Sequence, residues 1–322
     1  MNLIVRICAV VLLTIASAGA SAQAFPSKPI RIVVPFSAGG PSDLTMRSIA
    51  PRMTELLGQS IVIDNRAGAT GIIGAEMVAK SPPDGYTLLM ATASVVGINM
   101  VTYSKLPYDT LRDFQPLTPV MTTTTILVVH PSVPAKNLKE LVALAKARPG
   151  QVTMGSAGTG GTLHLALEML NKEAAVNMTH VPYKGAAPAV VDVVAGQLSG
   201  MFVDLPVVSP YIKAGRVKAL AVASPKRSVY FPDVPTTKEA GYPNVELQNY
   251  YALLLPAKTP REIVAKLHDA VVKSVNTPGV REKLVGLGAD PLTMTPDEFT
   301  RFLRADIEMW GRVVKAAGVK VE

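Results

Sequence analysis

An apolar segment that leads through a glycine-rich turn into an amphipathic segment constrains this chain more than any other feature. Residues 30–34 are mostly β-branched and apolar, which is typical of a short strand, and the turn at residues 36–40 follows. Ser42 or Asp43 can cap the next helix, and Gly58 supplies its end. One face of that helix is apolar, at Ile49, Met53, Leu56 and Leu57. Such a unit directs backbone N–H groups and the positive end of a helix dipole at one point, which suits an anion.

The same pattern returns in the middle of the chain. A short strand over residues 152–154 precedes a loop at residues 155–161, and a helix begins at Thr162, which is the natural cap. The apolar face of this helix contains Leu163, Leu167 and Leu170. A single glycine loop is weak evidence, because glycine turns often only reverse the chain. Two loops that face each other would bring two helix N-termini to one anion.

The order of the predicted elements indicates an α/β fold with two lobes. Strands and helices alternate, which favours sheets of parallel strands joined by right-handed crossovers. A strand–proline–helix unit at residues 126–147 recurs at residues 250–274, as expected where a chain crosses twice between two lobes. We therefore expect lobe 1 to contain residues 25–124 and 251–322, and lobe 2 to contain residues 125–250. A ligand would bind between the lobes, at the carboxyl ends of the strands.

The N-terminus predicts export. Arg6 precedes a mostly apolar run at residues 7–16, and small residues at 20–24 fit a signal-peptidase site. We expect residues 1–24 to be a cleaved signal peptide and the mature protein to be periplasmic. Cys8 lies in this segment and is the only cysteine, so the mature chain would have no disulfide and no cysteine ligand for a metal.

Motif searches give no reason to expect an enzyme, a cofactor or a metal. The chain contains no phosphate-binding G-x-x-x-x-G-K-[ST] sequence, and Met154 occupies the first glycine position of G-x-S-x-G around Ser156. None of the four histidines belongs to an H-E-x-x-H sequence. The net charge of +8 includes no run of basic residues, so nucleic acid is not expected as a partner.

Three further polar residues are candidates for a site between the lobes. His164 stands near a predicted helix N-terminus, where it could be a neutral donor or simply a packing or capping residue. Tyr183 and Asp204 each follow a strand; Asp204 could receive an ammonium group or could cap a turn at the surface. The far end of the pocket is expected to include residues 91–95, Asn99 and Tyr250.

Several segments, in this order along the chain, resemble the periplasmic solute-binding receptors of tripartite tricarboxylate transporters, often called Bug receptors. The segments span residues 25–31, 35–43, 83–89, 106–109, 155–160, 180–185 and 232–236. The resemblance covers essentially the whole mature chain. It implies a type II periplasmic-binding-protein fold, or Venus flytrap, in which two loops hold a carboxylate through backbone N–H groups, small hydroxyls and ordered water.

Carried onto this sequence, the resemblance assigns both loops to ligand binding. Together with the polar candidates, the predicted site residues are Phe36, Ser37, Ala38, Gly39, Gly40, Asp43, Ser156, Ala157, Gly158, Thr159, Gly160, Gly161, His164, Tyr183 and Asp204. The chain departs from the family at Gly161, where Ser is common, at Met154, where Tyr is frequent, and at Val203-Asp204, where Asp-Asn often occurs. The last departure displaces the acidic side chain by one residue, which on a strand changes the face it occupies.

We therefore expect a monomeric receptor that captures a small organic carboxylate and delivers it to a membrane transporter. The ligand could be a dicarboxylate or tricarboxylate, an aromatic acid or an acidic amino acid. Two alternatives remain open: a receptor that serves a sensor or chemotaxis partner, and a hydrolase that uses Ser156. A bulky residue at Gly40 or Gly158 is expected to abolish binding while the fold survives.

Overall fold

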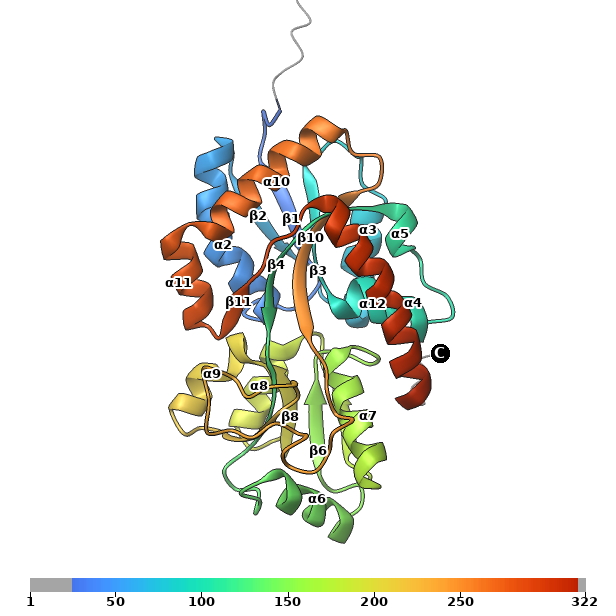
Figure 1. Ribbon diagram of the computed structural model, residues 1–322, viewed down its shortest axis with the longest axis vertical. Helices are drawn as coiled ribbons and strands as arrows, with labels where there is room; N and C mark the ends of the chain where they lie inside the picture. Colours follow the sequence, from blue (N-terminus) through green and yellow to red (C-terminus); the bar gives the residue numbers. More distant parts are fainter. Residues whose placement is uncertain (1–24, 318–322) are drawn as a thin grey trace, which may run out of the picture.

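The computed structural model describes residues 25–317, which form two lobes one above the other (Figure 1). The first lobe is built on a sheet of the strands β1 (Ile30–Val34), β2 (Ile61–Asn65), β3 (Thr87–Thr92), β4 (Phe114–Thr123), β10 (Asn249–Pro256) and β11 (Ala289–Pro291), in the order β11-β4-β10-β3-β1-β2. Its helices are α2 (Pro41–Leu57), α3 (Ile72–Ala79), α4 (Asn99–Thr102), α5 (Thr110–Asp113), α10 (Arg261–Asn276), α11 (Pro278–Gly286) and α12 (Pro296–Ala317), with short helical turns η2 (Ala69–Gly71) and η3 (Ser94–Ile98).

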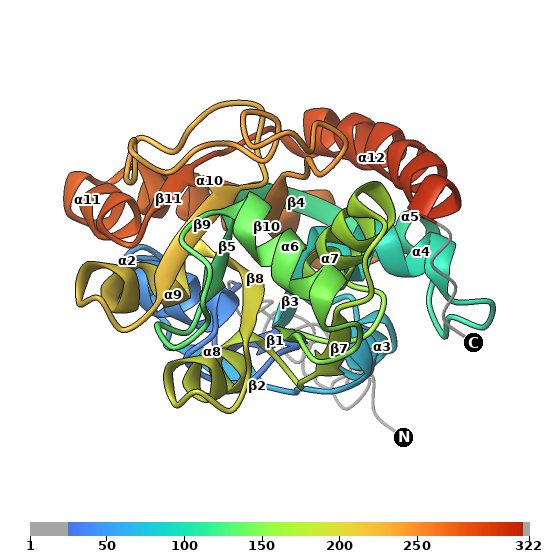
Figure 2. The ribbon, with the colours of Figure 1, turned by 90° about the horizontal axis from the view of Figure 1, so that it is seen from below.

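The second lobe repeats this design on a smaller scale. Its strands are β5 (Thr125–Val129), β6 (Thr153–Ser156), β7 (Thr179–Pro182), β8 (Gly200–Asp204) and β9 (Lys218–Val222), in the order β7-β6-β8-β5-β9. The helices α6 (Leu138–Ala147), α7 (Thr162–Ala174), α8 (Ala186–Val194) and α9 (Leu205–Lys213) surround these strands when the lobe is seen from below (Figure 2).

Both sheets contain the expected parallel strands, and both are mixed because antiparallel strands join them. In the first lobe β1 runs parallel to β2 and β3, whereas β10 is antiparallel to β3 and β4. In the second lobe β6 is parallel to β7 and β8, whereas β5 is antiparallel to β8 and β9. The antiparallel strands β5 and β10 are those that carry the chain from one lobe to the other. We propose the lobe division at residues 125 and 250 on the basis of these two crossings.

The sequence pattern does not predict β4, because Pro116 and Pro119 interrupt it. Proline cannot donate a hydrogen bond to a neighbouring strand and is usually excluded from the middle of a sheet. Here the pairing of β4 with β10 shifts register twice, beside Ala252, which is opposite Pro119, and Leu254, which is opposite Pro116. The irregular register therefore accommodates both prolines inside the sheet.

Strand β10 presents alternate residues to two different cores. Tyr251 and Leu253 pack with α2 and α10 on one face of the sheet. Tyr250 and Leu254 belong to the core that also contains Phe299 of α12, on the other face. This alternation is the ordinary period of a strand. Because of this alternation, Tyr251 reaches the space between the lobes and Tyr250 does not.

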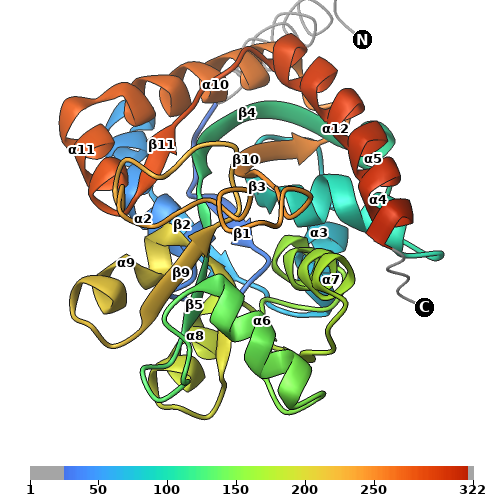
Figure 3. The same ribbon diagram turned by 60° about the horizontal axis from the view of Figure 1, so that its bottom comes forward.

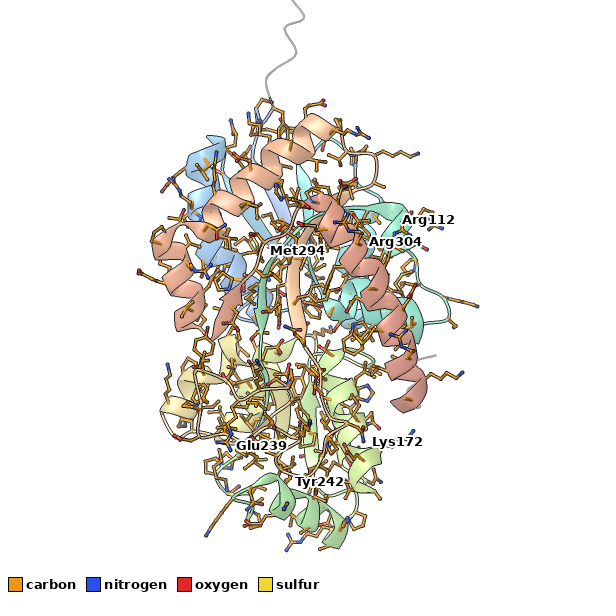
Figure 4. The ribbon with its side chains drawn as sticks, viewed as in Figure 1. Arg112, Lys172, Glu239, Tyr242, Met294 and Arg304 are labelled. Carbon is orange, nitrogen blue, oxygen red and sulfur yellow. The ribbon has the colours of Figure 1, made fainter. Side chains whose placement is uncertain are left out.

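The C-terminal helix joins the two lobes at their outer side. Helix α12 spans Pro296–Ala317 and runs along the edge of the first lobe beside α4 (Figure 3). Its last turns contact α7 of the second lobe, where the ammonium group of Lys172 donates to the carbonyl of Ala316; Lys172 lies on α7 near this end of α12 (Figure 4). Between residues 25 and 317, no helix has the length and apolar character needed to span a membrane. The expected signal peptide, residues 1–24, lies outside the described residues.

Candidate functional site

The loop between β1 and α2, residues 36–40, is hereafter the first loop. Helix α2 begins after Gly40 with Pro41, and no side chain caps it, so the expectation that Ser42 or Asp43 is the cap is wrong. Asp43 instead accepts the N–H of Gly39 at 3.0 Å, while Arg47 Nε donates to the same carboxylate at 2.9 Å. Although burial raises the pKa of Asp43, these donors outweigh it and hold the pKa below its ordinary value. Gly39 of the first loop is thus held from within its own lobe.

The second loop, residues 155–161, is held differently. Helix α7 begins after Gly161, so Thr162 is its first residue, and the prediction that Thr162 is the cap is wrong. The N–H of Thr162 donates to Ser94 Oγ at 3.0 Å, and Ser94 belongs to η3 in the other lobe. This hydroxyl satisfies a free N–H group of the first turn, as the side chain of a local N-cap residue does in other helices. Here the cap comes from across the space between the lobes.

Further hydrogen bonds join the second loop to the first lobe. The carbonyl of Thr159 accepts hydrogen bonds from Thr70 Oγ1 at 2.6 Å and from Tyr103 Oη at 3.1 Å. On the opposite side, the N–H of Ser37 donates to the carbonyl of Lys184 at 3.2 Å. The lobes therefore contact each other on both sides of the space that separates the two helix N-termini.

Both helix N-termini line one cavity between the lobes. Its wall consists of Phe36, Pro41, Ser42, Thr70, Thr92, Ser94, Ala157, Gly158, Gly161, Thr162, Leu163, Ala186, Asp204, Asn249 and Tyr251. The space between them has a volume of about 30 Å³, which is room for water and not for an organic acid of several carbons. A ligand of that size therefore requires the lobes to move apart.

The first turns of the two helices offer backbone donors at this cavity. Among the hydrogen bonds of residues 25–317, none occupies the amide N–H groups of Ser42 and Asp43 in α2, or of Leu163 and His164 in α7. These are the second and third residues of each helix, whose N–H groups have no acceptor within the helix. The arrangement can hold an anion by N–H groups and helix dipoles, without any basic side chain on the cavity wall.

The polar side of the cavity is organised around Asp204, the last residue of β8. Its carboxylate accepts hydrogen bonds from Thr125 Oγ1 at 2.6 Å, Asn249 Nδ2 at 2.7 Å and Tyr251 Oη at 2.5 Å. Thr125 and Asn249 begin the two strands that cross between the lobes. Burial raises the pKa of Asp204, against which the three donors act. Asp204 is 2% exposed, so it does not cap a surface turn; it joins both crossings to the cavity.

Ser156 and the two histidines near it form a separate cluster behind the second loop. Ser156 Oγ lies 2.6 Å from His180 Nε2 and accepts the N–H of Gly158. His164 Nδ1 accepts the N–H of Gly160 at 3.0 Å, and the rings of His164 and His180 stack at 3.8 Å. Burial, with His164 close by, lowers the pKa of His180 to about 4. Because Ser156 is fully buried and lies outside the cavity wall, its hydroxyl supports the loop and is not a nucleophile for a ligand there.

The predicted site residues divide into three groups. Those on the cavity wall are Phe36, Ala157, Gly158, Gly161 and Asp204. Those that lie in or directly behind the two loops without forming the wall are Ser37, Ala38, Gly39, Gly40, Asp43, Ser156, Gly160 and His164. Thr159 and Tyr183 line a shallower hollow at the edge of the interlobe space. Burial and Asp192, which accepts from Tyr183 Oη, raise the pKa of Tyr183 to about 12.

Residues 91–95 contribute Thr92 and Ser94 to the wall, whereas Asn99 and Tyr250 lie elsewhere. Asn99 Nδ2 donates to the carbonyl of Thr70 at 3.2 Å, behind the wall. Tyr250 Oη donates to Asp306 at 2.7 Å on the opposite face of β10.

The predicted site residues omit five polar residues of the cavity wall, namely Ser42, Thr70, Thr162, Asn249 and Tyr251. The sequence predicts Ser42 and Thr162 only as possible helix caps. The strand period around Tyr250 offers a signal for Asn249 and Tyr251, because neighbours on a strand occupy opposite faces.

Comparison with known proteins places these features among receptors. The profile described as "Tripartite tricarboxylate transporter family receptor" matches residues 45–319. BugT of Bordetella pertussis is 36% identical over 324 residues, covering 98% of this chain and 99% of BugT. The structure of Rpa4515 from R. palustris with adipate is 35% identical with a TM-score of 0.88, covering 92% of this chain and 99% of the other. MatC from Rhodopseudomonas palustris with bound malate is 33% identical with a TM-score of 0.86, covering 90% and 100%.

Proposed function

The chain belongs to the receptor family of tripartite tricarboxylate transporters, whose members are solute-binding proteins and not enzymes, and from this premise we propose how it binds its solute. The N–H groups at the N-termini of α2 and α7 hold one carboxylate of a small organic acid, and the lobes close over it. The observation that carries the proposal is that both first turns line one cavity with their second and third amides free. Structures similar to this one have been solved with adipate and with malate.

The charge balance of the cavity supports this mode of binding. Its wall contains no Lys, Arg or His among the described residues, so the partial positive charges of two helix N-termini are what a carboxylate would meet. A hydrogen bond to a charged group contributes about 1.5–3 kcal/mol. Several of these bonds, less the cost of ordering the ligand and closing the lobes, give micromolar binding or tighter.

Delivery of the bound acid to a membrane transporter in the periplasm is the second part of the proposal. The family to which the chain belongs supports it, as does the export signal expected at residues 1–24. The monomeric state is also a proposal. The alternative partner, a sensor or chemotaxis protein, would use the same closed form. Co-purification of the receptor with the membrane components of a transporter, in the presence and absence of ligand, distinguishes the two.

The binding proposal is tested by calorimetry on the mature protein. Thermal-shift screening of monocarboxylates, dicarboxylates, tricarboxylates, aromatic acids and acidic amino acids selects the ligands, and neutral sugars and polyamines serve as controls. We expect carboxylates alone to raise the melting temperature, and the methyl ester of the best ligand to bind at least about tenfold more weakly, since it loses the charge. Equal binding of acid and ester would contradict the proposal.

A further inference from the structure

The part of the cavity wall contributed by β3 and β10 has a defined hydrogen-bonding character. Thr92 is paired with Tyr251 in the antiparallel register of β3 and β10, and Asn249 is two residues from Tyr251 on the same face. All three residues line the cavity and are at most 4% exposed. The sheet thus places three polar side chains side by side, and two of them, Asn249 and Tyr251, donate hydrogen bonds to Asp204.

Two polar atoms in this group have no partner. Asn249 donates its Nδ2 to Asp204 at 2.7 Å, which fixes the orientation of the amide and leaves its carbonyl oxygen. That oxygen, Oδ1, is buried without a hydrogen-bond partner, and so is Thr92 Oγ1. A buried polar atom without a partner costs about 1–3 kcal/mol. The atom left on Asn249 is an acceptor only, so the group that satisfies it must be a donor.

The charge at this end of the cavity opposes a second carboxylate on the ligand. Asp204 is the one acidic residue on the wall, and no basic side chain among the described residues lines the cavity to offset a further negative charge. A carboxylate placed here would meet the acceptor of Asn249 and the carboxylate of Asp204. Like charges at short range in a buried site cost more than they do in water.

Resting on the proposed function, we infer that the ligand of this receptor is a monoanion: one carboxylate held by the helix N-termini, and a second group that donates a hydrogen bond to Asn249 Oδ1 and is not negatively charged. Hydroxy acids and carboxylates with an amide or ammonium group belong to this class. Thr92 and Asn249 are the specificity-determining residues, and Asp204 is a positioning residue that orients Asn249.

The test compares three series of acids of matched length by calorimetry at pH 8, where both groups of a dicarboxylate are ionised. The series are alkanoates from propionate to hexanoate, the same acids with a terminal hydroxyl, and dicarboxylates from malonate to adipate. We expect the tightest hydroxy acid to bind at least about tenfold more tightly than the alkanoate and the dicarboxylate of the same length. A dicarboxylate that binds more tightly than its hydroxy analogue overturns the inference but leaves the carboxylate site intact. If no acid binds, the proposed function fails and this inference with it.

Variants identify the atoms responsible. Thr92→Val removes the unpartnered hydroxyl with almost no change of shape, and we expect it to reduce the preference for the hydroxy acid over the alkanoate several-fold. Asp204→Asn removes the negative charge, and it should lower the ratio of the dicarboxylate Kd to the hydroxy-acid Kd about tenfold. Thr110→Val is the matched control, because Thr110 Oγ1 is also buried without a partner but lies in α5, outside the cavity. If Thr92→Val and Thr110→Val show the same preference for the hydroxy acid over the alkanoate, Thr92 does not determine specificity. This comparison can be made even if Asp204→Asn fails to fold.

Discussion

The two loops that face each other across the cavity look alike in sequence and are held in different ways. In the first loop, Asp43 and Arg47 of the same lobe fix the position of Gly39. In the second loop, Ser94 binds Thr162, and Thr70 and Tyr103 bind Thr159, all from the opposite lobe. When the lobes separate, the first loop keeps the bond of Gly39 to Asp43 and loses only the bond of Ser37 to Lys184. The second loop keeps its bonds to Ser156 and His164 and loses those to Ser94, Thr70 and Tyr103.

This difference predicts that the two loops contribute differently to ligand affinity and to the stability of the fold. Bonds that exist within one lobe contribute equally to the open and closed forms, so they stabilise the fold without favouring closure. Bonds that join the lobes exist only when the lobes are together, so they favour the closed form, and any ligand that needs that form gains from them. The bonds between the second loop and the first lobe should therefore control affinity, whereas the bonds that each loop makes within its own lobe should control stability.

The largest test of this comparison exchanges glycine for alanine in each loop. A Cβ at Gly158 would lie 2.7 Å from Thr70 Oγ1 and 3.3 Å from Thr70 Cα, across the gap between the lobes. At Gly40 the nearest atom to a Cβ is the carbonyl of Ser37, at 3.2 Å in the same loop. Since overpacking costs about 1–3 kcal/mol, we expect Gly158→Ala to weaken binding up to about a hundredfold and Gly40→Ala less than about tenfold.

Backbone strain needs its own control, because Gly158 has a φ of +142°, which alanine rarely adopts. Gly150 has a φ of +76°, a Cβ there would come no closer than 3.9 Å to a neighbouring atom, and the residue is remote from the cavity. Gly150→Ala therefore carries strain without a clash and should lower the melting temperature but keep the affinity. If calorimetry finds that Gly158→Ala and Gly40→Ala lose the same affinity, the two loops do not differ in their contribution to binding.

A second test uses pH, since only the second loop is supported by histidines. Burial lowers the pKa of His180 to about 4, against about 6.5 in the unfolded chain. The unfolded state then binds more protons between these values, so stability is complete above pH 7 and falls as the pH is lowered towards 4. Groups near the ring are Ser156, His164 and, through His164, Glu168.

Urea unfolding between pH 7 and pH 5 measures this effect. We expect the free energy of unfolding of the unmodified protein to fall by about 2 kcal/mol more than that of His180→Gln, whose amide can still bond Ser156. His268→Gln is the control, because His268 bonds the carbonyl of Met294 in the first lobe. Parallel pH curves for the unmodified protein and His180→Gln would show that the histidine does not couple the second loop to pH.

The sequence predicts the strand–loop–helix units of this fold better than it predicts how distant strands pair. The two strand–loop–helix units and the crossing strands have strong local signals, and Gly58 ends α2 in the left-handed conformation as predicted. Strand β4 has no such signal, because its prolines are tolerated only through register shifts against β10. The residues of β4 alone do not show that β10, far away in the sequence, pairs with it in a shifted register that tolerates the prolines.

For the site, the sequence identifies both loops but not what holds them. Ser42, Asp43 and Thr162 are good cap residues, yet the structure caps α7 with Ser94, which lies 68 positions away, and leaves α2 without a side-chain cap. Residues that meet across the two lobes are far apart in the sequence, so the pattern of neighbouring residues does not reveal their contact. The same limit explains why Gly40 and Gly158 look equivalent in the sequence, although only Gly158 lies against the other lobe.

The smallest test separates binding from stability with one polar substitution in each loop. Ser94→Ala removes the cap of Thr162, worth about 1 kcal/mol, so affinity should fall about fivefold with little change in the melting temperature. Asp43→Asn removes a buried charge that binds Gly39 and the half-exposed Arg47, so the free energy of unfolding should fall by about 1 kcal/mol while affinity changes less than about twofold. Urea unfolding and calorimetry on both variants measure the two quantities. If Asp43→Asn instead loses affinity and Ser94→Ala loses stability, then the first loop depends on closure and the second does not, and the contrast between them is reversed.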